Sequence, residues 1–179
     1  MKKYDGMTFR KEGDTTYCSF NLEEALNQDN PRNIFLNGQL YIEAECDRII
    51  DTFFQTSDGC KNACLTNFLK SKYCRFDTKI AWLTMLKKLD SEKGVVDVVD
   101  KKIIAALNSI ACVRNSFHHY LIYEDALRNV KKATSKLHTK KLSDIEDIDE
   151  LINCFKKEVT FVYSEIRKLL KKEIERAKN

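Results

Sequence analysis

The chain has 179 residues, of which 43% are hydrophobic and 32% are charged, and its formal net charge is +4. This length suits one domain with a proper core, and the modest net charge does not decide between function classes. No apolar run approaches the ~20 residues that span a membrane, and the N-terminus lacks the apolar core of a signal peptide. We therefore expect a cytoplasmic protein without a membrane partner.

Seven cysteines stand at positions 18, 46, 60, 64, 74, 112 and 154, without the spacing of a disulfide framework. Those at 46, 112 and 154 fall among apolar residues, which indicates small buried side chains that stay reduced. Cys60, Cys64 and Cys74 are closer together, and zinc is the alternative for them, although a second pair of ligands is missing and no His lies nearby. We expect reduced cysteines and no metal or cofactor.

Residues 1–37 differ from the rest, and we expect a small appendage there rather than a domain. The segments 8–10 and 15–20 flank Lys-Glu-Gly-Asp, which is typical of a short hairpin. Asn21 is a candidate helix N-cap with Glu24 at the third helical position. Asn30 and Pro31 are expected to break the chain again, and the main domain is expected over residues 38–179.

The apolar periodicities of the main domain predict an all-α fold, an antiparallel bundle of at least four main helices, with any strand confined to residues 1–37. The first helix is expected over 40–55, a short one over 62–70 and another over 77–89. The first of these has one apolar face, made of Ile42, Cys46, Ile49, Ile50 and Phe53.

A further apolar helix leads into an unusual polar segment. Its apolar residues at positions 99, 103, 107 and 110 recur at helical spacing, and the next position on that face is Arg114. A guanidinium on an apolar face is costly unless it is paired or faces a cavity or a partner. Asn115, His118 and His119 follow closely. The helix is expected to continue to Tyr123 or to bend near Asn115.

Residues 126–142 contain no acid and several basic side chains. Clustered cations release counterions from a polyanion, so this strip is a candidate RNA-binding surface. The residues expected to bind are Arg128, Lys131, Lys132 and Lys136. The alternative is a basic face in contact with solvent only.

The last helix is expected to start at the acidic segment 143–147. Apolar residues at positions 145, 148, 152, 155, 159, 162, 166 and 169 then alternate spacings of three and four. This pattern favours a long helix packed in the bundle. A dimer-forming coiled coil is the alternative, but Phe161, Tyr163 and Leu170 widen the apolar surface beyond a narrow seam.

The segment 114–119, RNSFHH, resembles the signature of the HEPN family, a set of helical domains that includes many metal-independent ribonucleases. That signature is an Arg, four to six residues and a His, often as R-N-x-F-A-H, so His119 takes the place of the family His. The upstream segment 76–80, FDTKI, is similar to the helix start that precedes the signature in many members. The resemblance covers roughly residues 40–178 in architecture and about a dozen residues in motif.

The resemblance implies an RNA endonuclease in which the RNA's own 2′-OH attacks the adjacent phosphate without a metal. Imidazole suits the proton transfers, and Arg offers a fixed fork of donors to the phosphate. The expected catalytic residues are Arg114, Asn115, which would orient His119 one helical turn away, and His119 itself. His118 is the alternative catalytic His because helical spacing places it with Arg114.

The resemblance also implies a homodimer, in which two signatures form one composite site, and a toxin or phage-defence setting with an antitoxin partner. The alternative is a non-catalytic HEPN-like binding or regulatory module. Arg114 would then cap a helix end, and His119 would be an ordinary, partly buried His.

Overall fold

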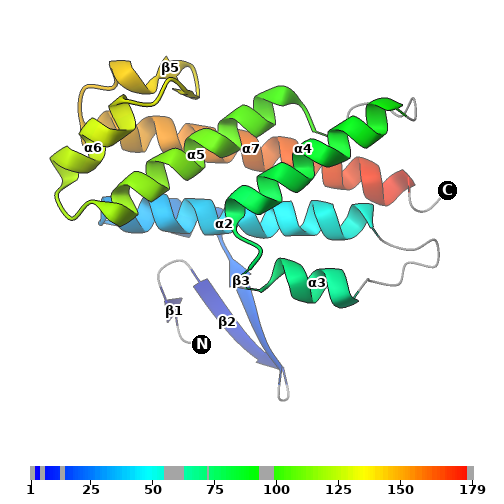
Figure 1. The fold of residues 1–179 in the computed structure, drawn as a ribbon. Helices are drawn as coiled ribbons and strands as arrows, with labels where there is room; N and C mark the ends of the chain where they lie inside the picture. The colour runs from blue at the N-terminus through cyan, green and yellow to red at the C-terminus, as the bar shows by residue number, and fades with distance from the viewer. Residues whose placement is uncertain are drawn as a thin grey trace.

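Most of the described chain is α-helical (Figure 1). The computed structural model describes residues 3–4, 7–12, 15–54, 63–71, 73–92 and 99–176. The helices are α1 (Leu22–Leu26), α2 (Pro31–Phe53), α3 (Ala63–Leu69), α4 (Phe76–Glu92), α5 (Lys101–His119), α6 (Tyr123–Lys131) and α7 (Ile148–Arg176). Within these ranges, no helix combines the length and the apolar composition needed to cross a membrane. The predicted all-α fold is confirmed.

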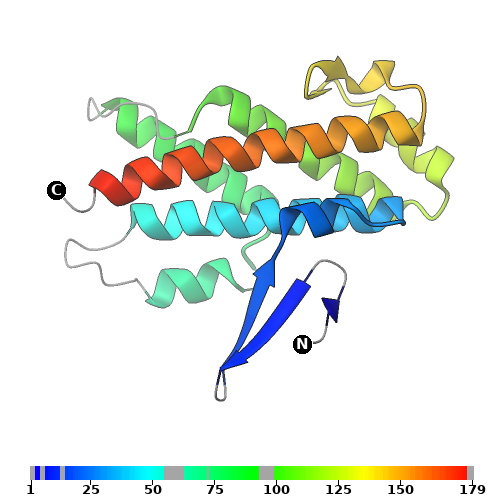
Figure 2. The same cartoon turned by 180° about the vertical axis from the view of Figure 1, so that it is seen from behind.

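The four long helices form two layers. Helices α2 and α7 lie side by side and run in the same direction, which is clearest from behind (Figure 2). Helices α4 and α5 lie across them, and α5 runs opposite to the other three (Figure 1). Three aromatic rings join the layers. The ring centroid of Phe35 in α2 lies 4.5 Å from that of Phe117 in α5 and 5.0 Å from that of Phe155 in α7. Phe117 therefore fixes the signature segment to the core.

Helix α2 begins at Pro31, so the predicted start at residue 40 is wrong. The side chain of Asn30 accepts a hydrogen bond from the backbone N–H of Arg32 at 2.9 Å, which makes Asn30 the N-cap. Pro31 occupies the first turn, where its missing N–H costs nothing. The pair that was expected to break the chain starts a helix instead, and the expected boundary between residues 37 and 38 falls inside α2.

Helices α3 and α4 lie where the sequence placed them. Helix α5 neither bends at Asn115 nor continues to Tyr123, because it ends at His119 and the backbone of Tyr120 is extended. The predicted apolar face of α5 is buried, but it continues through Val113 and Phe117 rather than through Arg114. Arg114 is half-buried at the edge of that face. A step of four residues from Ile110 leads to Arg114, whereas a step of three leads to Val113. A helix with 3.6 residues per turn alternates the two steps, and here the buried face takes the step of three.

Two small sheets accompany the helices. The predicted N-terminal hairpin is confirmed as the antiparallel pair β2 (Met7–Glu12) and β3 (Thr15–Phe20), with β1 (Lys3–Tyr4) beside β2. The prediction that strands are confined to residues 1–37 is wrong, because β4 (Lys136–Leu137) pairs with β5 (Lys140–Lys141). His138 turns the chain between them with a φ of 58°, in the left-handed region.

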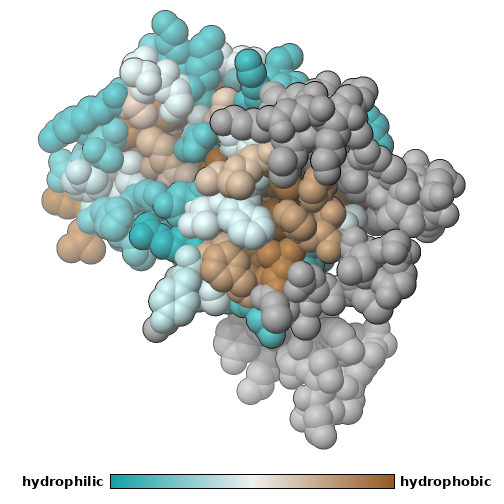
Figure 3. Space-filling model, turned by 45° about the vertical axis from the view of Figure 1, so that its right-hand side comes forward, coloured by the Kyte–Doolittle hydropathy of each residue, from teal (hydrophilic) through white to brown (hydrophobic). Residues whose placement is uncertain are grey.

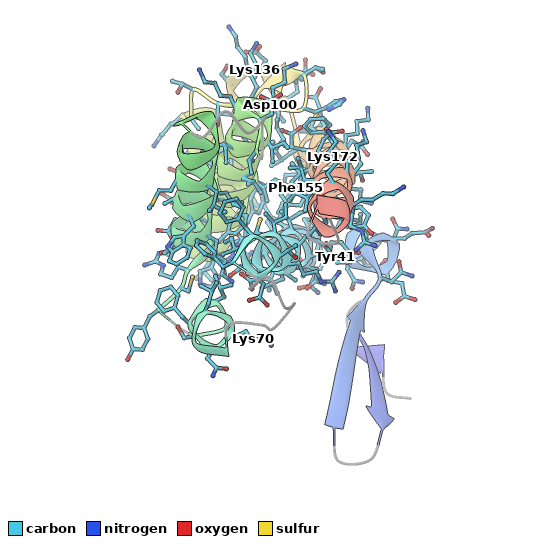
Figure 4. All side chains as sticks on the ribbon, turned by 90° about the vertical axis from the view of Figure 1, so that its right-hand side faces the viewer. Tyr41, Lys70, Asp100, Lys136, Phe155 and Lys172 are labelled. Atoms are coloured by element: carbon cyan, nitrogen blue, oxygen red, sulfur yellow. The ribbon has the colours of Figure 1, made fainter. Side chains whose placement is uncertain are left out.

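The last helix packs in the bundle, as predicted. It begins at Ile148, after a 3-10 turn, η1 (Leu142–Asp144), and the buried, extended Ile145. Its most deeply buried residues face the core, where Phe155 lies between α2 and α7 (Figure 4). These fully buried side chains are Leu151, Phe155, Val159, Val162 and Ile166.

Candidate functional site

The C-terminal end of α5 carries the predicted catalytic residues in one and a half turns. Ser116 is buried, Arg114 is half-buried, and Asn115, His118 and His119 are exposed. The rings of His118 and His119 are 5.3 Å apart and meet edge to face. Two imidazoles and a guanidinium therefore share one end of one helix.

Asn115 contacts Arg114 rather than His119. The guanidinium Nη1 of Arg114 donates a hydrogen bond to the Asn115 side-chain oxygen at 3.0 Å. The Nε of Arg114 is buried and has no hydrogen-bond partner among the described residues. Asn115 thus holds the guanidinium in place, and the Nη2 of Arg114 makes no hydrogen bond among the described residues.

One pocket beside Arg114 lies between α2, α4 and α5 and has a volume of about 250 Å³. It brings Phe76 and Asp77, from the FDTKI segment, next to Arg114 and Asn115. Its walls carry charges of both signs, since the Arg75 Nε lies 3.7 Å from the Asp77 carboxylate. The full lining is Gln39, Glu43, Arg75, Phe76, Asp77, Ala111, Arg114 and Asn115.

The second pocket, of about 190 Å³, lies between α2 and the end of α5. Arg114 and His118 both line it because they are one helical turn apart. His119 lines neither pocket in the described part of the chain. The lining of this second pocket contains no carboxylate and consists of Arg32, Asn33, Leu36, Arg114, Phe117, His118 and Leu121.

Arg32 is the site residue that the sequence did not reveal. Its Nη2 donates to the backbone oxygen of Tyr120 at 2.8 Å and to that of Leu121, and its guanidinium lies 4.9 Å over the Tyr123 ring. Arg32 therefore holds the end of α5, and Arg114 does not. The Asn30-Pro31 pair could have shown that Arg32 stands in a first helical turn, but not that this turn lies beside the signature.

Helix α6 holds the turn after the signature from the other side. The Asn129 side-chain amide donates to the Ser116 hydroxyl at 2.9 Å, and the Tyr120 hydroxyl donates to the Asn129 oxygen at 3.4 Å. Tyr123, at the start of α6, donates to Asn30 at 3.1 Å. The two histidines therefore stand on a helix end that both α2 and α6 anchor.

A buried ion-pair cluster lies at the edge of the first pocket. The Lys79 ammonium, only 4% exposed, is 2.9 Å from Glu43 and 2.9 Å from Asp47. Burial disfavours its charge, but the hydrogen bonds to both carboxylates outweigh burial and raise the pKa of Lys79. Glu43 lines the pocket, so this cluster fixes the charge of one pocket wall.

The predicted basic strip is partly paired within the protein. Arg128 lies 3.1 Å from Asp125, and the Lys131 ammonium donates to the Glu146 backbone oxygen at 3.3 Å. Lys132 and Lys136 are exposed. Figure 4 shows Lys136 on the side of the bundle opposite to α2, and none of these four residues lines either pocket.

The cysteines whose side chains are described, 46, 74, 112 and 154, are free thiols. Burial raises the pKa of Cys112, which keeps its thiol protonated and unreactive. Residue 60 and the side chain of Cys64 lie outside the described residues, and so does the zinc alternative that needs them. The described residues contain no group of three or more His, Cys, Asp or Glu side chains placed to hold a metal ion.

Comparisons of the chain with protein-family models, with curated proteins and with solved structures find no match. The HEPN resemblance therefore rests on the signature residues and the helix start before them.

Proposed function

We propose that this protein is a metal-independent RNA endonuclease of the HEPN type. The observation that carries the proposal is the state of Arg114, which lines two pockets beside a pair of histidines and has no carboxylate partner among the described residues. A guanidinium that is fixed but not neutralised is suited to bind a phosphate diester.

The reaction needs a base, an acid and positive charge. A base removes the proton of the RNA's 2′-OH, the resulting oxyanion attacks the adjacent phosphorus, and the bond to the 5′-oxygen breaks. An acid protonates that leaving oxygen, and the products are a 2′,3′-cyclic phosphate and a 5′-OH. We assign phosphate binding to Arg114, positioning of that guanidinium to Asn115, and proton transfer to His119, with His118 as the alternative.

We propose that the active form is a homodimer with a composite site. One exposed His cannot easily serve as base and acid on opposite sides of the phosphate, whereas two facing signatures supply both groups. Large apolar side chains are exposed next to the histidines, with Leu121 at 89% and Ile122 at 58%. Exposed apolar groups of this size beside a polar site are typical of an interface.

The proposed setting is a toxin or phage-defence effector with an antitoxin partner in the cytoplasm. Lys132 and Lys136, exposed and without a carboxylate partner among the described residues, are the strongest candidates in the basic strip for guiding RNA. The rival is a non-catalytic binding module, and the observation that favours it is that His119 lines neither pocket.

The test is incubation of purified protein with single-stranded RNA and with DNA of the same sequence, both in EDTA. We expect RNA fragments with 2′,3′-cyclic phosphate ends and intact DNA, because DNA lacks the attacking 2′-OH. Fragments with 3′-hydroxyl ends would contradict this mechanism, and RNA that is bound but uncut would favour the binding module.

A further inference from the structure

We infer that Arg32, Arg114 and His118 form a phosphate-binding site in the second pocket, and that Arg32 is a phosphate-binding residue outside the signature. This inference deepens the proposed function, and it rests on that function only for the statement that the phosphate belongs to RNA. The binding of a phosphate group itself follows from the charges and donors of the pocket.

The arginines of this protein fall into two groups. Most arginines with described side chains have a guanidinium nitrogen between 2.8 and 3.8 Å from a carboxylate oxygen, namely Arg48, Arg75, Arg128 and Arg167. Among the described side chains, Arg32 and Arg114 have no such carboxylate, and both line the second pocket. The unpaired guanidinium groups are thus gathered at one place.

The second pocket is built to attract an anion. Two half-buried guanidinium groups of like charge line it, together with an imidazole, and no acidic side chain does. The Nε atoms of Arg32 and Arg114 are both buried without a hydrogen-bond partner among the described residues. Because these Nε atoms are closed off from solvent, the donors left for a ligand are Nη1 of Arg32 and Nη2 of Arg114, which make no hydrogen bond among the described residues. A phosphate offers such donors both acceptor oxygens and negative charge.

The structural role of Arg32 leaves donors for a ligand. Its hydrogen bonds to the Tyr120 and Leu121 carbonyls both use Nη2. A guanidinium has five N–H donors, so Nη1, besides the buried Nε, has no partner among the described residues and is the nitrogen left for a ligand. The contact with the Tyr123 ring and the two carbonyl bonds fix the plane of the fork. A preorganised fork loses little entropy when it binds an oxyanion.

The chain has three histidines, which makes an imidazole NMR titration a direct test. Inorganic phosphate is added to the full chain at constant ionic strength, with chloride as the reference salt. We expect a saturable movement of the His118 resonances, a smaller one for His119 and none for His138, which lies on the β4–β5 turn. Equal movements of all three, or movements that chloride reproduces, would overturn the inference.

Variants identify the guanidinium groups. Arg32→Gln and Arg114→Gln should each weaken phosphate binding at least ~10-fold, as expected for the loss of a hydrogen bond between charged groups. Arg167→Gln removes the same charge from a paired arginine and should leave the dissociation constant unchanged. An Arg32→Gln protein that folds and binds phosphate like wild type would reduce Arg32 to a helix cap. If Arg32→Gln unfolds, the titration of the wild type still tests whether the second pocket binds phosphate.

A second arm connects the site to RNA. Inorganic phosphate should compete with a 2′-O-methyl RNA oligonucleotide, which cannot be cleaved, and the competition should disappear in Arg32→Gln. Phosphate binding without RNA cleavage by the wild type would leave the anion site standing and remove the endonuclease. RNA cleavage by a wild type that does not bind phosphate would support the endonuclease and rule out the anion site.

Discussion

Glu158 is a buried carboxylate on α7 that faces the turn between β4 and β5. The Nδ1 of His138 lies 3.8 Å from the carboxylate. Burial raises the pKa of Glu158, and a backbone hydrogen bond from His138 only partly opposes this. The ionised carboxylate is therefore less favourable in the folded protein than in the unfolded chain.

This raised pKa predicts a pH dependence of stability. The stabilising contribution of protonated Glu158 is fully present below the ordinary carboxyl pKa of 4.5 and is lost as pH rises through the higher folded value. The free energy of unfolding of Glu158→Gln, measured relative to that of wild type, should therefore increase as the pH rises from about 4 to about 8. Denaturant unfolding at both pH values measures this, with Glu165→Gln on the same helix as control. The same difference in unfolding free energy between Glu158→Gln and wild type at both pH values would contradict the raised pKa of Glu158.

At the scale of elements, Gly38 sets the distance between α2 and α7. A Cβ atom at this position would lie 2.7 Å from the Phe155 ring and 3.2 Å from Leu26. Phe155 is fully buried and also contacts Phe35, so the ring has little room to move. The glycine is required by this close approach of a side chain to the backbone.

Gly38→Ala should destabilise the protein by about 1 to 3 kcal/mol, although Ala is the better helix former by about 1 kcal/mol. In a Phe155→Leu background the smaller side chain relieves the clash, so Gly38→Ala should cost much less there. A double-mutant cycle from denaturant unfolding gives the coupling. Equal costs in both backgrounds would mean that Gly38 is not needed for packing.

The ion-pair cluster joins α2 to α4. Lys79→Met leaves Glu43 and Asp47 without their shared cation and should cost roughly 3 to 5 kcal/mol, the range for breaking a buried pair. Lys168→Met removes an exposed partner of Glu165, and we expect less than about 1 kcal/mol. Thermal unfolding of both variants tests this, and similar losses would show that burial of Lys79 does not matter.

Periodicity predicted the elements well where one face is apolar and long. The buried faces of α5 and α7 are examples. It failed at Pro31, because a Pro marks both chain breaks and first helical turns, and only the Asn30 cap distinguishes them. It also failed at β4 and β5, because strands of two residues carry no alternation to detect.

The candidate site was predictable only as far as local spacing reaches. Arg114 needed a cavity, and the structure provides two. Arg32 comes to the same pocket from a helix far away in the sequence, so no local pattern connects it to the signature. The sequence likewise could not show that Asn115 would bond to Arg114 instead of His119.

At the scale of the whole molecule, the exposed apolar side chains that the structure describes include two groups. One lies around α3 and α4, where the exposed Phe54 and Phe68 contact the half-buried Trp82 and Met85 is exposed one helical turn further along α4. Figure 3 shows apolar surface, in brown, on one face of the molecule. The other group adjoins the second pocket and includes Leu121 and Ile122. This second group joins the candidate site directly, because Leu121 lines the second pocket, so we place the proposed dimer interface there.

Ile122→Asp tests the interface without harming the fold. Ile122 is the N-cap of α6 and makes no side-chain cap hydrogen bond, whereas Asp is among the best N-caps. We expect wild type to sediment as a dimer at micromolar concentration, and Ile122→Asp to sediment as a folded monomer that cleaves RNA poorly. Met85→Asp, in the other region, should stay dimeric. A monomeric but fully active Ile122→Asp protein would rule out the composite site.

The most direct test of the central claim is the rate of single-stranded RNA cleavage in EDTA by wild type, Arg114→Ala, His118→Ala and His119→Ala. Loss of general acid–base catalysis typically costs 10²- to 10⁴-fold, and we expect a loss of about this size for His119→Ala. Arg114→Ala should lose phosphate stabilisation and fall similarly. If His118→Ala loses cleavage and His119→Ala does not, the catalytic His is His118 and the endonuclease function stands. If all three variants cut RNA as fast as wild type, the endonuclease site is not at the end of α5, and the claim is wrong.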